Sequence, residues 1–179
     1  MLNTIYLIGY MGAGKSVIGE ALSSINGYDF YDLDQYIEEK ESKKISEIFN
    51  ENNEVYFRKI ENTYLKEISF MKNNKIISTG GGTPCFKNNI EIINNTSNSV
   101  SIYLKTKVET LVSRLKETLD KRPLISNLKD EIHLKEFITK HLFERSFYYE
   151  KSKYKIKTDN LDIEEIASSI NKILTQIDT

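Results

Sequence analysis

Short apolar runs alternate along this chain with longer segments in which apolar side chains recur at helical spacing. The runs are rich in Ile, Val, Leu and Tyr, as strands are, and they cover residues 4–8, 28–31, 75–79, 100–104 and 154–158. Strands that alternate with helices are typical of right-handed crossovers and a parallel sheet. The pattern predicts an α/β fold in which helices flank a five-stranded parallel sheet in three layers.

The clearest helical pattern lies near the end of the chain. Apolar side chains form one stripe along residues 161–177, and Asp162 and Glu165 have the spacing of an N-terminal capping box. Thr106 and Glu109 have the same spacing after the fourth strand. We therefore expect a capping box at the start of each of these two helices.

Composition favours a single domain over residues 1–179. The chain is 39% hydrophobic and 28% charged, which suits one well-filled core. Its net charge is −1 and its lysines are scattered, so we expect neither a nucleic acid nor a membrane as partner. The single Cys85 cannot form an intrachain disulfide, and no apolar run has membrane-spanning length. We expect a cytoplasmic protein that is a monomer by default.

A phosphate-binding motif stands between the first strand and the helix that follows it. Residues 9–16 read GYMGAGKS and match the pattern G-x-x-x-x-G-K-[ST]. Glycines in such a loop let successive backbone N–H groups approach one anion at the positive end of a helix. Lys15 adds a positive charge for the outer phosphates, and Ser16 offers a hydroxyl to Mg²⁺. A chance Gly-rich turn is the alternative, and the flanking strand and helix argue against it.

Two carboxylates follow the second strand, at the edge where open parallel sheets bind their ligands. Asp32 and Asp34 can divide the work only if the chain turns into a helix between them. Asp32 would then support a metal ion, and Asp34 would accept hydrogen bonds from a substrate hydroxyl or act as a base. The structural alternative is that one of them caps the next helix.

Three glycines, Gly80, Gly81 and Gly82, follow the third strand. The absence of side chains there lets a small ligand approach the backbone closely. Arg58 precedes Glu61 by one helical turn, a spacing at which the carboxylate can orient the guanidinium. The alternative is a solvated ion pair of little energetic value.

Arginine is scarce in this chain. Only four of its 25 basic residues are arginines, namely Arg58, Arg114, Arg122 and Arg145. Where lysine serves as the general cation, positions that keep arginine are candidates for roles that need its planar guanidinium, although each could be arginine by chance. Arg122 lies in a polar stretch, about 117–131, between two predicted helices, which suits a mobile lid over the phosphates.

These motifs form one specific combination. It comprises the loop 9–16, Asp32-x-Asp34, Phe57-Arg58 with Glu61, the triple glycine 80–82, Arg122-Pro123-Leu124-Ile125, and Glu144-Arg145 with Tyr149. In this combination, and over nearly the whole chain from residue 4 to about 177, the sequence resembles the shikimate kinase family.

The resemblance implies an ATP- and Mg²⁺-dependent enzyme of aromatic amino acid biosynthesis that phosphorylates the 3-hydroxyl of shikimate. It implies that shikimate is bound by Asp34, Arg58, Gly80, Gly81, Gly82 and Arg145. It implies that ATP is bound by Gly12, Ala13, Gly14, Lys15, Ser16, Val17, Arg114, Arg122 and Asp159, with Arg114 stacked on the adenine. Lys15, Asp34 and Arg122 would be the catalytic residues, and Ser16 and Asp32 would hold the metal ion.

Two other functions stay open. Another small-molecule kinase of the same architecture, for gluconate or a nucleoside monophosphate, would need acceptor groups other than Arg58, Arg145 and the triple glycine. A nucleotide-binding module without catalysis would not need both Lys15 and Asp34, and the chain has both.

Overall fold

The computed structural model describes residues 2–119, 125, 128 and 130–177, and within them one parallel sheet forms the centre of the molecule. Its strand order is β2-β3-β1-β4-β5. The strands are β1 (Thr4–Ile8), β2 (Asp29–Asp32), β3 (Lys75–Ser78), β4 (Ser99–Lys105) and β5 (Tyr154–Lys157). Each predicted strand is confirmed, and each predicted bound is correct to within one residue.

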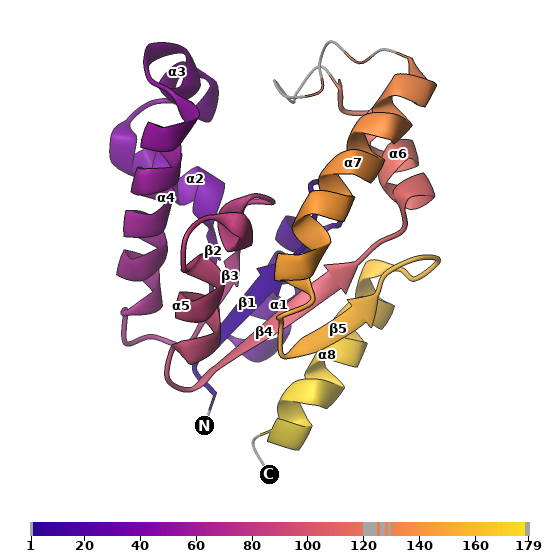
Figure 1. Cartoon of the computed structure of the whole chain (residues 1–179). Coiled ribbons are helices and arrows are strands. Elements are labelled where there is room, and N and C mark those ends of the chain that lie inside the picture. The colour runs from indigo at the N-terminus through magenta and orange to yellow at the C-terminus, as the bar shows by residue number, and fades with distance from the viewer. Residues whose placement is uncertain (1, 120–124, 126–127, 129, 178–179) are drawn as a thin grey trace.

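Helices link the strands and cover both faces of the sheet, as predicted for an α/β fold (Figure 1). They are α1 (Lys15–Asn26), α2 (Leu33–Glu41), α3 (Ile45–Glu51), α4 (Glu54–Ser69), the 3₁₀ helix η1 (Thr83–Cys85), α5 (Asn89–Asn95), α6 (Val108–Lys116), α7 (Glu131–Tyr149) and α8 (Ile163–Ile177). Helix α1 packs against α8 and β3, whereas α5 packs on β4. In Figure 1, α2, α3 and α4 stand together on one side of the molecule, and α6 and α7 stand on the other.

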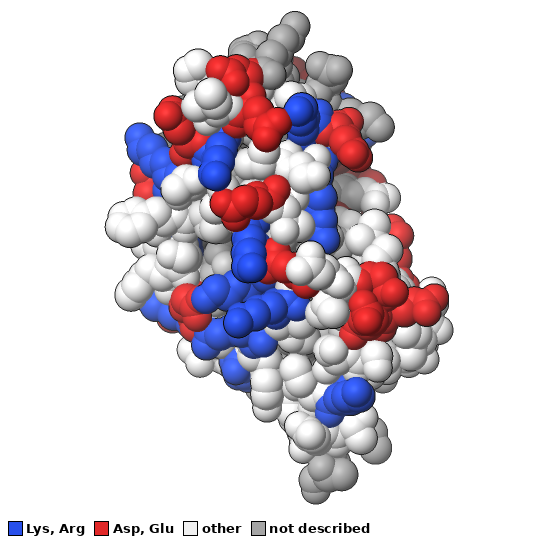
Figure 2. All heavy atoms as spheres, turned by 90° about the vertical axis from the view of Figure 1, so that its right-hand side faces the viewer, with Lys and Arg blue, Asp and Glu red and all other residues white. Residues whose placement is uncertain are grey.

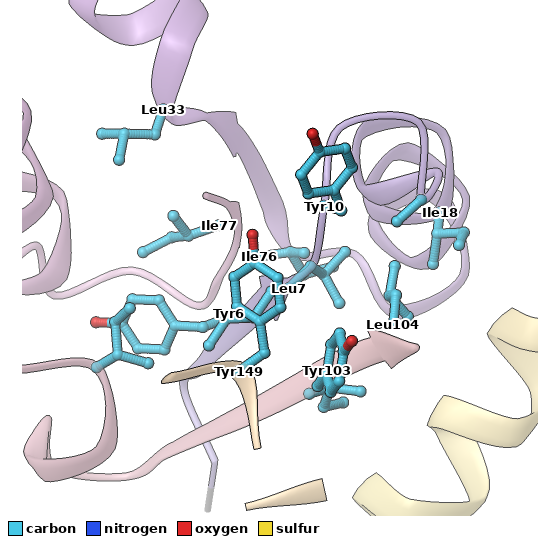
Figure 3. Close-up of a cluster of buried hydrophobic side chains, with 14 of the residues drawn as sticks. Tyr6, Leu7, Tyr10, Ile18, Leu33, Ile76, Ile77, Tyr103, Leu104 and Tyr149 are labelled. Carbon is cyan, nitrogen blue, oxygen red and sulfur yellow. The ribbon is translucent and has the colours of Figure 1, made fainter. Parts of the chain in front are cut away.

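The core lies around the central strands. Every residue of β1 and of β3 is buried, as expected for strands that helices cover on both faces. Figure 3 shows Tyr6, Leu7, Ile76 and Tyr103 within this core. The hydroxyl of Tyr6 donates to Ser69 Oγ at 2.7 Å, so its polar atom is satisfied inside the core. Close packing of this kind fixes the strand ends, from which the loops with the predicted site residues begin.

The predicted capping box of α8 is confirmed. The backbone N–H of Asp162 donates to Glu165 Oε2 at 2.9 Å, and the N–H of Glu165 donates to Asp162 Oδ1 at 2.8 Å. Two unpaired N–H groups at the start of the helix are thereby satisfied.

The predicted capping box of α6 is wrong. The N-cap of this helix is Lys107, and the Thr106 hydroxyl is instead buried against the Thr158 hydroxyl at 2.7 Å. Asp159 supplies the cap from the loop after β5: its Oδ1 accepts from the Lys107 N–H at 2.9 Å and from the Thr110 hydroxyl at 2.7 Å. A contact between distant segments has replaced the local one.

Charged side chains of both signs are interspersed over the face shown in Figure 2. Within the described part of the chain, no helix combines the length and the apolar character needed to cross a membrane.

Candidate active site

The predicted phosphate-binding loop runs from the end of β1 into α1. Gly12 and Gly14 have positive φ angles of 81° and 92°, a conformation that residues with a Cβ rarely adopt. Gly14 is the N-cap of α1 and provides no side-chain cap, which leaves the first N–H groups of the helix for an anion. A cavity of about 310 Å³, which we call the loop cavity, is lined by several predicted residues, among them Gly12, Gly14, Lys15, Ser16 and Val17.

Lys15 lies within the loop and is only 8% exposed. Its Nζ donates to the backbone carbonyl of Gly9 at 3.0 Å and to that of Tyr10 at 3.1 Å. These bonds hold the ammonium group beside the backbone that curves around the loop cavity. A positive charge at this place suits the outer phosphates of a nucleotide.

Ser16 and Asp32 meet at the loop cavity. Ser16 Oγ donates to Asp32 Oδ2 at 2.6 Å, while Asp32 Oδ1 caps α2 by accepting from the N–H groups of Asp34 and Gln35. Asp32 therefore caps the helix, as the structural alternative predicted, and it also bonds the Ser16 hydroxyl that was predicted to bind the metal ion. Both side chains offer oxygen atoms, which Mg²⁺ prefers, and the cation usually takes further ligands from substrate phosphates and water. Among the described residues, no three His, Cys, Asp or Glu side chains cluster as a metal site.

Asp34 lies in the first turn of α2, because the chain turns into a helix directly after Asp32. Burial, followed by repulsion from Asp32 and Glu61, raises the pKa of Asp34 to about 6, although Lys15 and Arg58 act in the opposite direction. A carboxylate whose pKa lies near neutral pH accepts a proton more readily than an ordinary one.

A second cavity, of about 470 Å³, adjoins the first, and we call it the arginine cavity. Its lining brings together the predicted acceptor residues Asp34, Arg58, Gly80, Gly81, Gly82 and Arg145. Met11, Asp34, Gly80 and Gly81 line both cavities, so the two are neighbours that share one wall. Phe49 and Phe57 add an apolar surface, with their ring centroids 4.7 Å apart.

Arg58 is held by a buried carboxylate. Its Nη1 donates to Glu61 Oε2 at 2.8 Å; the Arg58 side chain is 14% exposed and that of Glu61 is fully buried. The alternative of a solvated pair is therefore wrong. Because a buried carboxylate accepts a hydrogen bond from one edge of the guanidinium, the orientation of Arg58 is fixed before any ligand binds.

The triple glycine makes room for these side chains. A Cβ on Gly82 would lie 2.4 Å from Arg58 Nη2, and a Cβ on Gly80 would lie 2.9 Å from Asp34 Oδ1 and from Glu61 Oε1. Charged groups of the site thus pack directly on this backbone.

Arg145 reaches the arginine cavity from α7, on the other side of the molecule from α4 (Figure 1). Its Cζ lies 5.7 Å from the ring centroid of Tyr10, within range of a cation–π contact. One turn later, the Tyr149 hydroxyl donates to the Gly81 carbonyl at 2.5 Å. Two consecutive turns of α7 therefore contact the phosphate-binding loop and the triple glycine.

Arg114 lies at the other end of the phosphate-binding loop. Its Nη1 donates to the Gly12 carbonyl at 3.2 Å, and it lines a third cavity, of about 630 Å³, together with Ala13, Val17 and residues at the start of α8. Phosphates in the loop cavity would therefore lie between an acceptor in the arginine cavity and a flat group beside Arg114 in the third cavity.

A family model described as shikimate kinase matches residues 11–175. The chain belongs to the shikimate kinase family. Among curated proteins, it is 46% identical to the shikimate kinase of Flavobacterium johnsoniae, over 97% of this chain and 99% of that protein. It is 37% identical to the shikimate kinase of Parabacteroides distasonis, over 97% of this chain and all of that protein.

Solved structures of shikimate kinases have the same fold as this family member. The crystal structure of the enzyme from Bacteroides thetaiotaomicron has a TM-score of 0.88 and 36% sequence identity, and the match covers 98% of each chain. The enzyme from Acinetobacter baumannii in complex with shikimate has a TM-score of 0.88 and 31% identity, over 98% of this chain and 94% of that one.

One predicted nucleotide residue, Asp159, lines none of the three cavities described above. Asp159 uses its carboxylate to cap α6, and its role toward adenine stays a prediction. Arg122, and most of the predicted lid at about 117–131, lie outside the described residues.

Some residues that hold the site together had no signal in the sequence. Thr83 and Asn89 are fully buried near the triple glycine, and the ring of Tyr10, in the phosphate-binding loop, lies against Arg145 of α7. Only the position of Thr83, directly after Gly82, could have indicated a contact with the site.

Proposed function

We propose that this protein transfers the γ-phosphate of ATP to the 3-hydroxyl of shikimate, giving shikimate 3-phosphate and ADP. Asp34, Gly80 and Gly81 line both the loop cavity and the arginine cavity, and this shared wall is the observation that supports the proposal most directly. A nucleotide phosphate in the first cavity and an acceptor in the second would meet at Asp34. Membership of the shikimate kinase family supports the same substrate.

Shikimate carries one carboxylate and three ring hydroxyls, and the arginine cavity offers a partner for each. Arg58 and Arg145 would bind the carboxylate, because a guanidinium can donate two parallel hydrogen bonds to it. Asp34 would accept hydrogen bonds from the hydroxyls, and Gly80, Gly81 and Gly82 would allow the ring to approach the backbone. The apolar surface of Phe49 and Phe57 suits the face of the ring.

ATP would bind with its phosphates in the loop cavity. The backbone of residues 12–17 and the Lys15 ammonium would hold the phosphates, and Arg114 would stack on the adenine. Ser16 and Asp32 would hold Mg²⁺, which when bound supplies positive charge to the phosphate oxygens. Arg122, from the predicted lid, would contact the phosphoryl group that is transferred.

Phosphoryl transfer proceeds through a loose transition state, so catalysis consists mostly of alignment and charge neutralisation. Asp34 would take the proton of the attacking hydroxyl on its carboxylate as the oxygen bonds to the γ-phosphorus and ADP leaves. Its pKa of about 6 leaves it mainly ionised at pH 7 to 8, as a base must be.

Release of ADP, measured with a coupled assay, tests the proposal. Shikimate, quinate, gluconate and AMP are offered in turn, with an acceptor-free reaction as the control for ATP hydrolysis. We expect rapid ADP release with shikimate alone, loss of the activity with excess EDTA and recovery with added Mg²⁺. Faster release with gluconate or AMP, or the same rate without an acceptor, would refute the assignment.

The assembly and location of the protein are separate proposals. A single cysteine suits a reducing cytoplasm, and the small cavity-centred site requires no second copy. We propose a monomer in the cytoplasm, which light scattering of the purified protein would test by its mass in solution.

A further inference from the structure

The carboxylate of Glu61 has two partners. Its Oε2 accepts from Arg58 Nη1 at 2.8 Å, and its Oε1 accepts from the hydroxyl of Thr83 at 2.6 Å. Glu61 and Thr83 are both fully buried. Arg58 is the residue that would meet the carboxylate of the acceptor, so the Thr83 hydroxyl would be linked to the substrate through three hydrogen bonds, by way of Glu61 and Arg58.

Hydrogen bonds hold the backbone of Thr83 at both its N–H and its carbonyl group. It is the first residue of η1, and its N–H donates to the Gly80 carbonyl at 3.1 Å. Its carbonyl accepts from Nδ2 of the buried Asn89 at 2.8 Å, and Asn89 Oδ1 in turn accepts from Nδ2 of Asn62 on α4. The backbone of Thr83 is therefore tied to the triple glycine, to α5 and to the helix that carries Arg58 and Glu61.

We propose that Thr83 is a positioning residue for the acceptor, a role that rests on the proposed function. Its hydroxyl holds Glu61 with Oε2 facing Arg58, and Glu61 in turn fixes the guanidinium of Arg58 at the arginine cavity. Arg58 also donates from Nε and Nη2 to Oε1 of the exposed Glu54, at 3.4 and 3.5 Å. Thr83 contacts neither cavity, so it acts through these two side chains.

The Thr83 hydroxyl is important because several side-chain oxygen atoms lie close to the Glu61 carboxylate. Glu61 Oε1, Asp34 Oδ1 and Thr83 Oγ1 all lie 2.9 Å from the position that a Cβ on Gly80 would take. Two negative oxygens thus approach the same point, and the Thr83 hydroxyl, which approaches it too, donates to Glu61 Oε1. If the hydroxyl is lost, a buried carboxylate oxygen loses its donor, which is costly, and Glu61 loses one of the two bonds that fix its orientation toward Arg58.

Two substitutions separate the hydroxyl from the methyl group. Thr83→Val keeps the shape of the side chain and removes the donor, whereas Thr83→Ser keeps the donor and removes the methyl group. We expect Thr83→Val to raise the KM for shikimate by about tenfold or more, equivalent to about 1.4 kcal/mol, with the KM for ATP unchanged within about twofold. Thr83→Ser should restore the KM for shikimate to within about twofold of the original.

If Thr83 had only a structural role, its variants would show a different pattern of KM values. Equal rises in both KM values for Thr83→Val, an unchanged KM for shikimate, or equal impairment by Thr83→Ser would each overturn the proposal. If Thr83→Val does not fold, as judged by thermal unfolding, Thr83→Ala and Thr83→Ser make the same comparison, because both lack the methyl group and only one keeps the hydroxyl. The unaltered protein is assayed alongside: failure to phosphorylate shikimate there would refute the proposed function and not the role of Thr83.

Discussion

Replacing Asp34 by Asn is expected to abolish turnover and to stabilise the fold at the same time. Asn has nearly the same shape, so the walls of both cavities should be preserved. It cannot accept a proton as a carboxylate does, and a positioned general base contributes about 10²- to 10⁴-fold to a rate. We therefore expect kcat to fall by at least about 100-fold, while the KM for ATP changes little.

The gain in stability follows from the pKa of Asp34, which rises from its ordinary value of 3.8 to about 6, mainly through burial. Because a folded-state pKa above the unfolded value means that the folded state holds the proton more tightly, the carboxylate is costly wherever it is ionised. At about 1.4 kcal/mol for each pH unit, the cost above pH 7 is at most about 3 kcal/mol. It disappears as the pH falls from about 6 to below 3.8. Loss of a favourable charge in the first turn of α2 would reduce the gain by about 0.5 kcal/mol.

Thermal unfolding at pH 8 and at pH 5 measures this difference. At pH 8 the Asp34→Asn variant should unfold about 4–10 °C above the original, since about 1 kcal/mol shifts the Tm of a chain of this size by about 2–4 °C. At pH 5 the original protein has recovered about half of the cost, so the difference should shrink by about half. Equal Tm values at pH 8, or a difference independent of pH, would refute the reasoning about Asp34. Undiminished turnover would show that the carboxylate is not the base.

Four further substitutions test other parts of the site. Arg58→Lys should raise the KM for shikimate by about tenfold or more and by more than Arg145→Lys, with little change in the KM for ATP; steady-state kinetics with each substrate varied would contradict this if both KM values rose together. Gly82→Ala should displace the Arg58 guanidinium, on which the new Cβ would press, and so raise the KM for shikimate about tenfold; an unchanged KM would count against the close packing. Arg114→Ala should weaken ATP binding about five- to tenfold in a direct titration and leave shikimate binding unchanged, whereas equal loss for both ligands would exclude a specific adenine contact.

Strands β1 and β3 could be predicted because strands that are buried on both faces are continuous apolar runs, and both of these are buried throughout. The capping box of α8 could be predicted because the side chain of each residue accepts from the backbone N–H of the other, three positions away. The box predicted for α6 failed because Thr106 has a better partner in Thr158, 52 residues away in the chain. The spacing of residues along the chain cannot predict a hydrogen-bond partner that is distant in the sequence.

For the candidate active site, too, some contacts could be predicted from the sequence and others could not. Asp34 and the triple glycine follow strands directly, and the carboxyl ends of neighbouring parallel strands meet at one edge, so their proximity follows from topology. Arg58 and Arg145 come from α4 and α7, which no spacing rule brings together, and their common cavity was expected only from the family resemblance. The contacts of Thr83 with Glu61, 22 residues away, depend on how η1 packs against α4 and had no sequence signal.

The two arginines of the arginine cavity are not equivalent. Glu61 is buried against Arg58 and neutralises its charge, so this pair presents hydrogen-bond donors in a fixed direction and little net charge. None of the ion pairs within the described residues involves Arg145, so no neighbouring carboxylate neutralises its charge, and it can attract the carboxylate of an acceptor. Recognition of the acceptor would thus combine one residue that attracts and one that orients. An ammonium group can replace the first more readily than the second, because lysine keeps the charge of arginine and loses its planar pair of donors.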